Sequence, residues 1–125
     1  MRYLTADEVL EIHATISGDY ALVRDLGLLE SAVARPQASA FGSDAYPDIV
    51  SKAAALLHSL VMNHAFLDGN KRTAVLALLV FADLNGCSVR WERQEALDLV
   101  VRLASGHVDF DEVKAFLHSR IHAKA

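Results

Sequence analysis

The residues with the greatest chemical potential gather in one short stretch, His64-Ala65-Phe66-Leu67-Asp68-Gly69-Asn70-Lys71-Arg72. It holds an imidazole, a carboxylate, a glycine, an amide and two cations. A neutral imidazole suits a general base near pH 7, and a carboxylate can hold Mg²⁺ against phosphate oxygens. Positioning, a metal, anion donors and a base are what phosphoryl or nucleotidyl transfer needs, so we interpret this stretch as the candidate active site.

The residues that follow suit an anion site at a helix start. Thr73–Leu84 is apolar on nearly every side, which is typical of a helix buried all round. The N–H groups of residues 69–72 are then the unpaired donors of its first turn, and Gly69 lets the backbone approach an anion closely. Lys71 and Arg72 add positive charge, and the Arg72 guanidinium is a fork suited to phosphate. Because the helix end alone contributes only about 0.3–1 kcal/mol when exposed, the two cations and a metal must supply most of the charge stabilisation.

Three other residues of the stretch have expected supporting roles. Phe66 and Leu67 are apolar and are expected to anchor the loop to the core. Asn70 can cap the helix or brace the loop through its amide.

Residue chemistry alone leaves a structural alternative open. His64 and Asp68 could cap the two helices while the two cations stay solvated, since polar clusters can be purely structural. His64 and Asp68 are also spaced as i and i+4, which would suit a metal-binding helix face. Gly69 favours a loop instead, and the sequence offers no third ligand, so a hydrolytic metal site is the weaker reading.

The rest of the chain predicts short, capped helices. Thr5 and Glu8 form a capping box at the start of the first helix, whose apolar face includes Val9, Ile12 and Ile16 and which ends at Gly18. Gly18–Gly27 is expected to be a loop, and Pro36–Tyr46 is expected to be either a surface loop or a short hairpin. Further helices are expected over residues 28–35, 47–63 with Pro47 as its first residue, 73–84, 94–104, and 109–121 with Asp109 and Glu112 as a second capping pair.

Strand patterns are scarce. Cys87–Trp91 is too short to assign as a strand, and no apolar–polar alternation exceeds four residues. We therefore predict an all-α fold over residues 1–125: a compact single-domain bundle of about six helices around a buried central helical hairpin. His13 is expected to be a partly buried structural histidine, and Cys87 a buried structural thiol.

Composition narrows the class of protein. The 125 residues are 53% apolar and carry a net charge of −4, which indicates a packed domain without direct nucleic-acid binding. One cysteine excludes an internal disulfide. The N-terminus lacks the apolar core of a signal peptide, and the longest apolar runs are about half of the roughly 20 residues that a membrane span requires. The sequence therefore predicts a soluble, cytoplasmic protein without a membrane partner.

The segment HAFLDGNKRTA resembles the active-site motif of the Fic/Doc family, H-x-F-x-D/E-G-N-x-R. The fixed positions are all met, by His64, Phe66, Asp68, Gly69, Asn70 and Arg72. Arg24–Ala32 is similar to the family's helix before the docking segment. Two matches in the right order, in a chain of the right length, imply a Fic/Doc-like domain.

Lys71 points to a subclass within this family. Fic AMP-transferases place glycine at that position and a second arginine where this chain has Val75, whereas Lys71 followed by Arg72 is similar to the Doc ("death on curing") toxins. That resemblance implies a protein kinase that moves the γ-phosphate of ATP to a threonine of elongation factor Tu and so arrests translation. Ala65 replaces the usual proline, a departure expected to matter less.

The resemblance also implies a role for each residue of the stretch. His64 would accept the proton of the target hydroxyl, Asp68 would hold Mg²⁺, Phe66 would anchor the loop, and the phosphates of ATP would lie against Gly69, Asn70, Lys71 and Arg72. Pro36–Tyr46 falls where the family docks its target.

Partners and rival activities follow from the same resemblance. A small antitoxin is expected to cover the active-site groove with a helix. No self-inhibitory S/T-x-x-x-E-G/N helix is recognisable, because Ser88–Glu92 has only its first half and Arg93 follows. Two alternatives stay open: a Fic-type AMP-transferase that modifies a protein hydroxyl, and a non-catalytic module that binds a nucleotide or a partner.

Overall fold

The structure is a computed structural model that describes residues 1–18 and 23–125. The expected loop over Gly18–Gly27 therefore lies partly outside the described residues. In the described part, helices dominate, and the elements follow in the order α1 (Ala6–Ser17), α2 (Leu26–Ala34), the 3-10 turn η2 (Arg35–Gln37), β1 (Ser39–Ala40), β2 (Ser43–Asp44), α3 (Ile49–Asn63), α4 (Asn70–Leu84), β3 (Cys87–Val89), α5 (Arg93–Ala104), α6 (Phe110–His118) and β4 (Ile121–Ala123).

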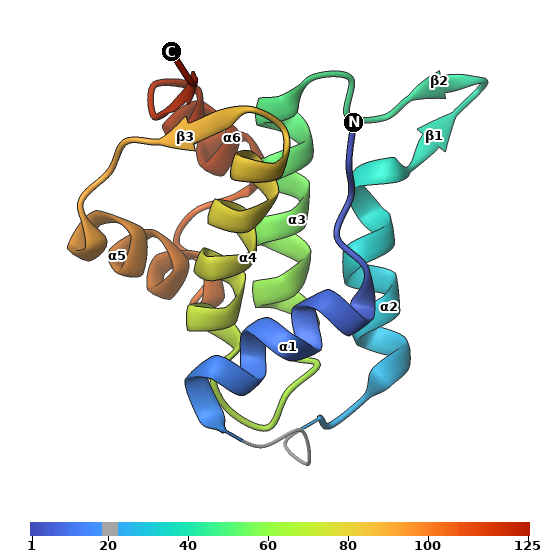
Figure 1. Cartoon of the computed structure of the whole chain (residues 1–125), viewed down its shortest axis with the longest axis vertical. Helices are drawn as coiled ribbons and strands as arrows, with labels where there is room; N and C mark the ends of the chain where they lie inside the picture. The colour runs from blue at the N-terminus through green and yellow to red at the C-terminus, as the bar shows by residue number, and fades with distance from the viewer. Residues whose placement is uncertain (19–22) are drawn as a thin grey trace.

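The α3–α4 hairpin lies at the centre of the bundle (Figure 1). Residues 51–57 of α3 are all buried, because α2, α4, α5 and α6 all pack against this helix. The fully buried side chains include Leu56, Leu57, Leu78 and Phe81. The prediction of a mostly helical domain around a buried hairpin is confirmed. None of the described helices has the length and apolar character that crossing a membrane would require.

The start of α1 agrees with the sequence, whereas α2 begins at Leu26 and α4 at Asn70, two and three residues before the predicted ranges. The capping box of α1 is present: Glu8 N donates to Thr5 Oγ1 at 3.2 Å, and Thr5 N donates to Glu8 Oε1 at 2.9 Å. At α3 the prediction of Pro47 as the first helical residue is wrong. Asp48 is the N-cap and accepts from Ser51 N at 2.7 Å. The Asp48 carboxylate accepts a hydrogen bond from the first turn of α3 and so stabilises a helix start at Ile49. Pro47 is only compatible with a helix start and forms no such bond.

Two strands, β3 and β4, were not predicted from the sequence. β3 pairs antiparallel with β4, and Val89 lies opposite Ile121. Ile121 was expected on the last helix, but α6 ends at His118, so the three-residue strands pair across a long separation that no local pattern reveals.

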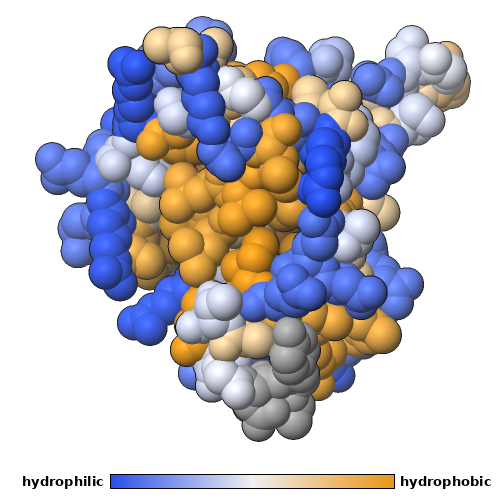
Figure 2. Space-filling view, viewed as in Figure 1, coloured by the Kyte–Doolittle hydropathy of each residue, from blue (hydrophilic) through white to orange (hydrophobic). Residues whose placement is uncertain are grey.

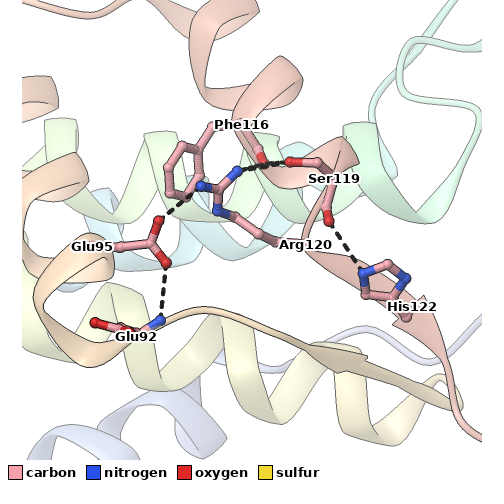
Figure 3. A network of polar contacts seen from close by, with 6 residues as sticks. All are labelled: Glu92, Glu95, Phe116, Ser119, Arg120 and His122. Carbon is pink, nitrogen blue, oxygen red and sulfur yellow. Dashed lines mark hydrogen bonds and ion pairs between the residues drawn. The ribbon is translucent and has the colours of Figure 1, made fainter.

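A polar network ties the chain end to α5 (Figure 3). Arg120 donates to Glu95 at 2.8 Å, and its guanidinium lies over the Phe116 ring with 3.7 Å to the centroid. Glu95 also accepts from Glu92 N at 3.1 Å, which closes the start of α5. The C-terminal segment is therefore anchored through α5 to the side of the bundle.

The β1–β2 hairpin projects from the N-terminal end of α3, away from the bundle (Figure 1). The segment expected over Pro36–Tyr46 thus contains a short hairpin. The 15 residues of α3 separate it from the polar stretch by about 22 Å along the helix axis. The hairpin therefore does not line the polar loop, and the expectation that Pro36–Tyr46 docks a target stays a prediction.

Candidate active site

The polar stretch forms the connection between the two central helices. α3 ends at Asn63, and His64 follows in the left-handed region with φ 50° and ψ 50°. Gly69 takes the same region, φ 79°, immediately before α4. Histidine tolerates this backbone conformation at a modest cost, whereas glycine adopts it freely. The chain therefore turns sharply at both ends of a short loop, and His64 stands at the first turn.

An amide bracket closes this loop from within. Phe66 N donates to Asn70 Oδ1 at 3.1 Å, and Asn70 Nδ2 donates to Phe66 O at 2.9 Å. Asn70 therefore braces the loop, the second of its two predicted roles. Phe66 is buried, as an anchor requires, but the prediction of Leu67 as an anchor is wrong, because its side chain is 63% exposed. Leu67 lies in the bend that follows the Val23–Phe66 bridge, where the chain leaves the core.

Arg24 holds the loop from outside. Its Nε donates to His64 O at 2.8 Å and its Nη2 donates to Asn63 O at 3.3 Å. The backbone N–H groups of Arg24 and Asp25 both donate to Ala65 O, at 2.8 and 3.1 Å. A guanidinium on the last carbonyls of α3 also complements the negative end of that helix. Sequence reasoning assigned Arg24 no role, and its only signal was its place in the second segment that resembles the family.

His13 of α1 contacts the loop on its buried side. It is 1% exposed, and its ring stacks on Phe66 with centroids 3.8 Å apart and planes at 4°. Its Nε2 lies 2.9 Å from Asp68 O. The sequence predicted a partly buried structural histidine, whereas the side chain is fully buried and touches the polar stretch directly.

Five of the predicted site residues share one hollow of about 330 Å³. It lies at the start of α4 and is lined by Ile16, Ser17, Asp68, Gly69, Asn70, Lys71 and Arg72. No side chain of the described residues caps this helix end, so its first-turn N–H groups are left for a ligand. Lys71 and Arg72 are exposed beside these donors. The hollow is suited to an anion with several oxygens, such as a polyphosphate.

The predicted residues outside the hollow are His64 and Phe66. His64 is exposed and is not among the described residues that line the hollow, although it belongs to the same loop. A base for an incoming hydroxyl must face the second substrate, so a position at the mouth of the loop is compatible with that role.

Asp68 is the residue that could hold a metal. Its carboxylate is exposed at the hollow, and no group of three or more metal-ligating side chains occurs in the described part of the chain. Mg²⁺ commonly uses one or two carboxylates together with waters and substrate phosphates. A single carboxylate beside an anion cradle therefore fits Mg²⁺ that arrives with a nucleotide, and does not fit a permanently bound structural metal.

A larger groove of about 660 Å³ adjoins the hollow and shares Ile16 and Arg72 with it. The remaining lining is mostly apolar: Val75, Leu76, Leu79, Val89, Trp91, Arg93, Ala96 and Leu97. Figure 2 shows the hydrophobic surface exposed over α4, between α1 and α5. An apolar groove with arginines in its lining suits an amphipathic segment that carries acidic residues.

Comparison with known proteins places these residues in a family. The family model described as Fic/DOC family matches residues 3–82, from before α1 to near the end of α4. The chain is 45% identical over 117 residues to "Toxin Doc" of Mycolicibacterium smegmatis, which covers 92% of this chain and 90% of that protein. It is 32% identical over 116 residues to "Protein kinase doc" of Escherichia phage P1, with 90% of each covered.

The matched region contains the whole of residues 64–72 together with His13 and Arg24, which contact them. Both relatives are also matched over about nine-tenths of their length, so the likeness continues beyond α4 through α5 and into α6. On this evidence the chain belongs to the Fic/DOC family.

Proposed function

We propose that this protein is a Doc-type toxin that transfers the γ-phosphate of ATP to a hydroxyl of a target protein. The observation that carries the proposal is the hollow at the start of α4, which joins the Asp68 carboxylate, unused first-turn N–H groups and two cations. The names of the two relatives support the toxin and kinase assignments. Lys71 supports the choice of phosphate transfer over AMP transfer, since it places a cation where AMP-transferases of the family have glycine.

Six residues of the loop then have roles in the transfer. His64 accepts the proton of the target hydroxyl as its oxygen bonds to the γ-phosphorus, and ADP leaves as the bond to its β-phosphate oxygen breaks. The residues that cradle the phosphates are Gly69, Asn70, Lys71 and Arg72. Asp68 would hold Mg²⁺, which neutralises charge on the phosphate oxygens when bound with ATP.

The proposed target and the proposed inhibitor both rest on the resemblance to the Doc toxins. We infer that the acceptor is a threonine of elongation factor Tu, so that the protein acts in the cytoplasm and arrests translation. The inhibitor is a small antitoxin whose helix covers the apolar groove and reaches the hollow through their shared residues, Ile16 and Arg72. An acidic antitoxin segment would pair with the Arg72 and Arg93 guanidinium groups.

Transfer of AMP is the second candidate. His64, Asp68 and Arg72 are common to both activities, as are Gly69 and Asn70. A module that only binds a nucleotide is the third candidate. One experiment separates the three, in which the protein is incubated with cell lysate, Mg²⁺ and ATP labelled at either the α- or the γ-phosphate.

The proposal predicts that protein becomes labelled from γ-labelled ATP only. Labelling from the α-phosphate would overturn the kinase assignment in favour of AMP transfer. If neither form of ATP labels protein, the third candidate, a module that only binds a nucleotide, would be favoured. His64→Ala is the control in each reaction, because it removes the base without touching a residue that lines the hollow.

A further inference from the structure

His13 is a buried polar side chain that lies outside the loop and is hydrogen-bonded to it. It belongs to α1, 55 residues before Asp68 in the chain. We infer that His13 is a positioning residue: its Nε2–H hydrogen bond to the Asp68 carbonyl fixes the direction of the Asp68 carboxylate and the start of α4. The inference rests on the proposed function, in which Asp68 holds Mg²⁺.

The hydrogen bond defines which ring nitrogen carries the proton. A carbonyl oxygen can only accept, so the Nε2 atom that lies 2.9 Å from Asp68 O must be protonated. Nδ1 lies 3.3 Å from Ser17 Oγ, one turn further along α1. The ring is thus held at both nitrogens, and burial at 1% exposure leaves it no room to rotate freely.

The contact falls at the point where the loop becomes the helix. Gly69 follows Asp68 with φ 79°, and a side chain there would place its Cβ 3.4 Å from His13 Nε2. His13 therefore packs directly under the turn that aims the first-turn N–H groups of α4 into the hollow. A shift of the Asp68 carbonyl would move both the metal-binding carboxylate and these donors, whereas Arg24 and Asn70 act on the earlier residues of the loop.

Stacking on Phe66 is the competing explanation for the position of the His13 side chain. The two rings are parallel at 4° with centroids 3.8 Å apart, so His13 could serve only to pack the anchor. The two roles use different parts of the side chain and can be separated by substitution. His13→Phe keeps an aromatic ring over Phe66 and loses the donor, while His13→Gln keeps a donor and loses the ring.

The test measures phosphate transfer from γ-labelled ATP as a function of Mg²⁺ concentration for both variants. For His13→Phe we expect the Mg²⁺ concentration at half-maximal rate to rise about tenfold, the usual weight of one hydrogen bond that orients a ligand, with a smaller fall in the rate at saturating Mg²⁺. His13→Gln should restore the Mg²⁺ dependence to within about twofold of the natural protein. Equal Mg²⁺ dependence in the two variants, or a defect confined to His13→Gln, would overturn the inference.

A second readout keeps the inference testable without any transfer. Mn²⁺, added alone, should broaden the amide NMR signals of residues 68–72 in the natural protein and in His13→Gln, and should do so only at higher concentration in His13→Phe. If the natural protein transfers no phosphate but shows this pattern, the proposed function fails and the positioning role stands. If transfer occurs but Mn²⁺ broadens these signals equally in all three proteins, the positioning role fails alone.

His58→Phe is the matched control. His58 is a half-buried histidine of α3 that also lies against an aromatic ring, Phe110, with centroids 5.9 Å apart. Its side-chain partner is Arg35, outside the loop. This variant should leave the Mg²⁺ dependence unchanged, and thermal unfolding of each variant shows whether any change reflects loss of folded protein. Should His13→Phe fail to fold, His13→Gln decides alone: a raised Mg²⁺ requirement in a folded His13→Gln would show that the ring, and not the donor, matters.

Discussion

Two residues other than glycine have positive φ in the described part of the chain: Phe41 at 53°, in the hairpin that precedes α3, and His64 at 50°, directly after α3. At the N-terminal end, Phe41 forms the tip of the β1–β2 hairpin and its side chain is fully exposed. At the C-terminal end, Arg24 holds the carbonyl of His64, and the residues that follow are held in turn. The same backbone conformation is thus a local turn at one end and part of a braced site at the other.

The hairpin turn and the α3–α4 loop differ in what holds their backbone in place. The hairpin needs only its own turn, because positive φ at Phe41 and Gly42 is the geometry of a type I′ connection. The catalytic loop draws its restraints from α1, from the segment before α2 and from α4. Strained residues persist where the surroundings over-determine them, and such places are often functional sites.

Removing the Arg24 side chain is the largest perturbation of the braced end. Arg24→Met keeps the apolar stem but loses the bonds to the carbonyls of Asn63 and His64. We expect transfer to fall by about 10- to 100-fold, because a displaced base loses its alignment. Thermal unfolding should change little, since Arg24 is exposed. A variant with full activity would show that the backbone bonds of Arg24 and Asp25 to Ala65 suffice.

Lys71→Gly, in the first turn of α4, tests whether the protein is a kinase or an AMP-transferase of the family. Lys71 is exposed at the hollow, and loss of its charge should weaken γ-phosphate transfer by roughly tenfold, the weight of one charge-assisted contact. Lys71→Ala separates loss of charge from the added backbone freedom of glycine. Kinase activity that is unchanged in both variants would mean that Lys71 does not set the orientation of the nucleotide.

At the hairpin end, Phe41→Asn should stabilise the protein by about 0.5–1 kcal/mol. Asn-Gly is the preferred pair for this turn, and replacing a fully exposed ring removes no buried area. Urea unfolding measures the gain. We expect transfer to stay unchanged, because the hairpin lies at the far end of α3 from His64. A lowered rate of transfer to the protein target, with normal stability, would show that the hairpin tip contacts the target, as the resemblance implies for Pro36–Tyr46.

The smallest effect concerns His58, between the two ends. Burial, and secondarily the nearby Arg35 charge, lower the pKa of His58 below its ordinary value of about 6.5. Since protonation is then easier in the unfolded chain, the folding free energy associated with this group is complete above pH about 6.5 and declines as pH falls toward the lower folded pKa. Unfolding curves at several pH values should therefore be less pH-dependent in this window for His58→Gln than for the natural protein. Equal pH dependence would contradict the assignment.

Local sequence signals predicted the parts of the fold that local chemistry decides. The capping boxes at Thr5 and Asp109, the buried helix after Gly69 and the helix end near Asn63 all follow from patterns within a few residues. The β3–β4 pair was missed because its strands are three residues long and lie far apart in the chain. Propensity in so short a strand is weaker than the tertiary context that pairs it.

The candidate site likewise has a part that local sequence reveals and a part that only the fold reveals. Residues 64–72 could be identified from their types and spacing, because they are contiguous. Arg24 and His13 reach that stretch across 40 and 55 residues, through contacts to backbone carbonyls. A backbone carbonyl has no sequence signature, so the side chains that bind it cannot be recognised before the fold is known. Such supporting contacts are the part of this site that required a structure.

The most direct test of the account is the mass of purified elongation factor Tu after incubation with ATP, Mg²⁺ and either the natural protein or His64→Ala. We predict a gain equal to one phosphate with the natural protein, on a threonine located by peptide fragmentation. With folded His64→Ala the gain should vanish, since losing a general base costs about 10²–10⁴-fold in rate. A gain equal to one AMP, or an unaltered gain of phosphate with His64→Ala, would contradict the proposed role of the α3–α4 loop.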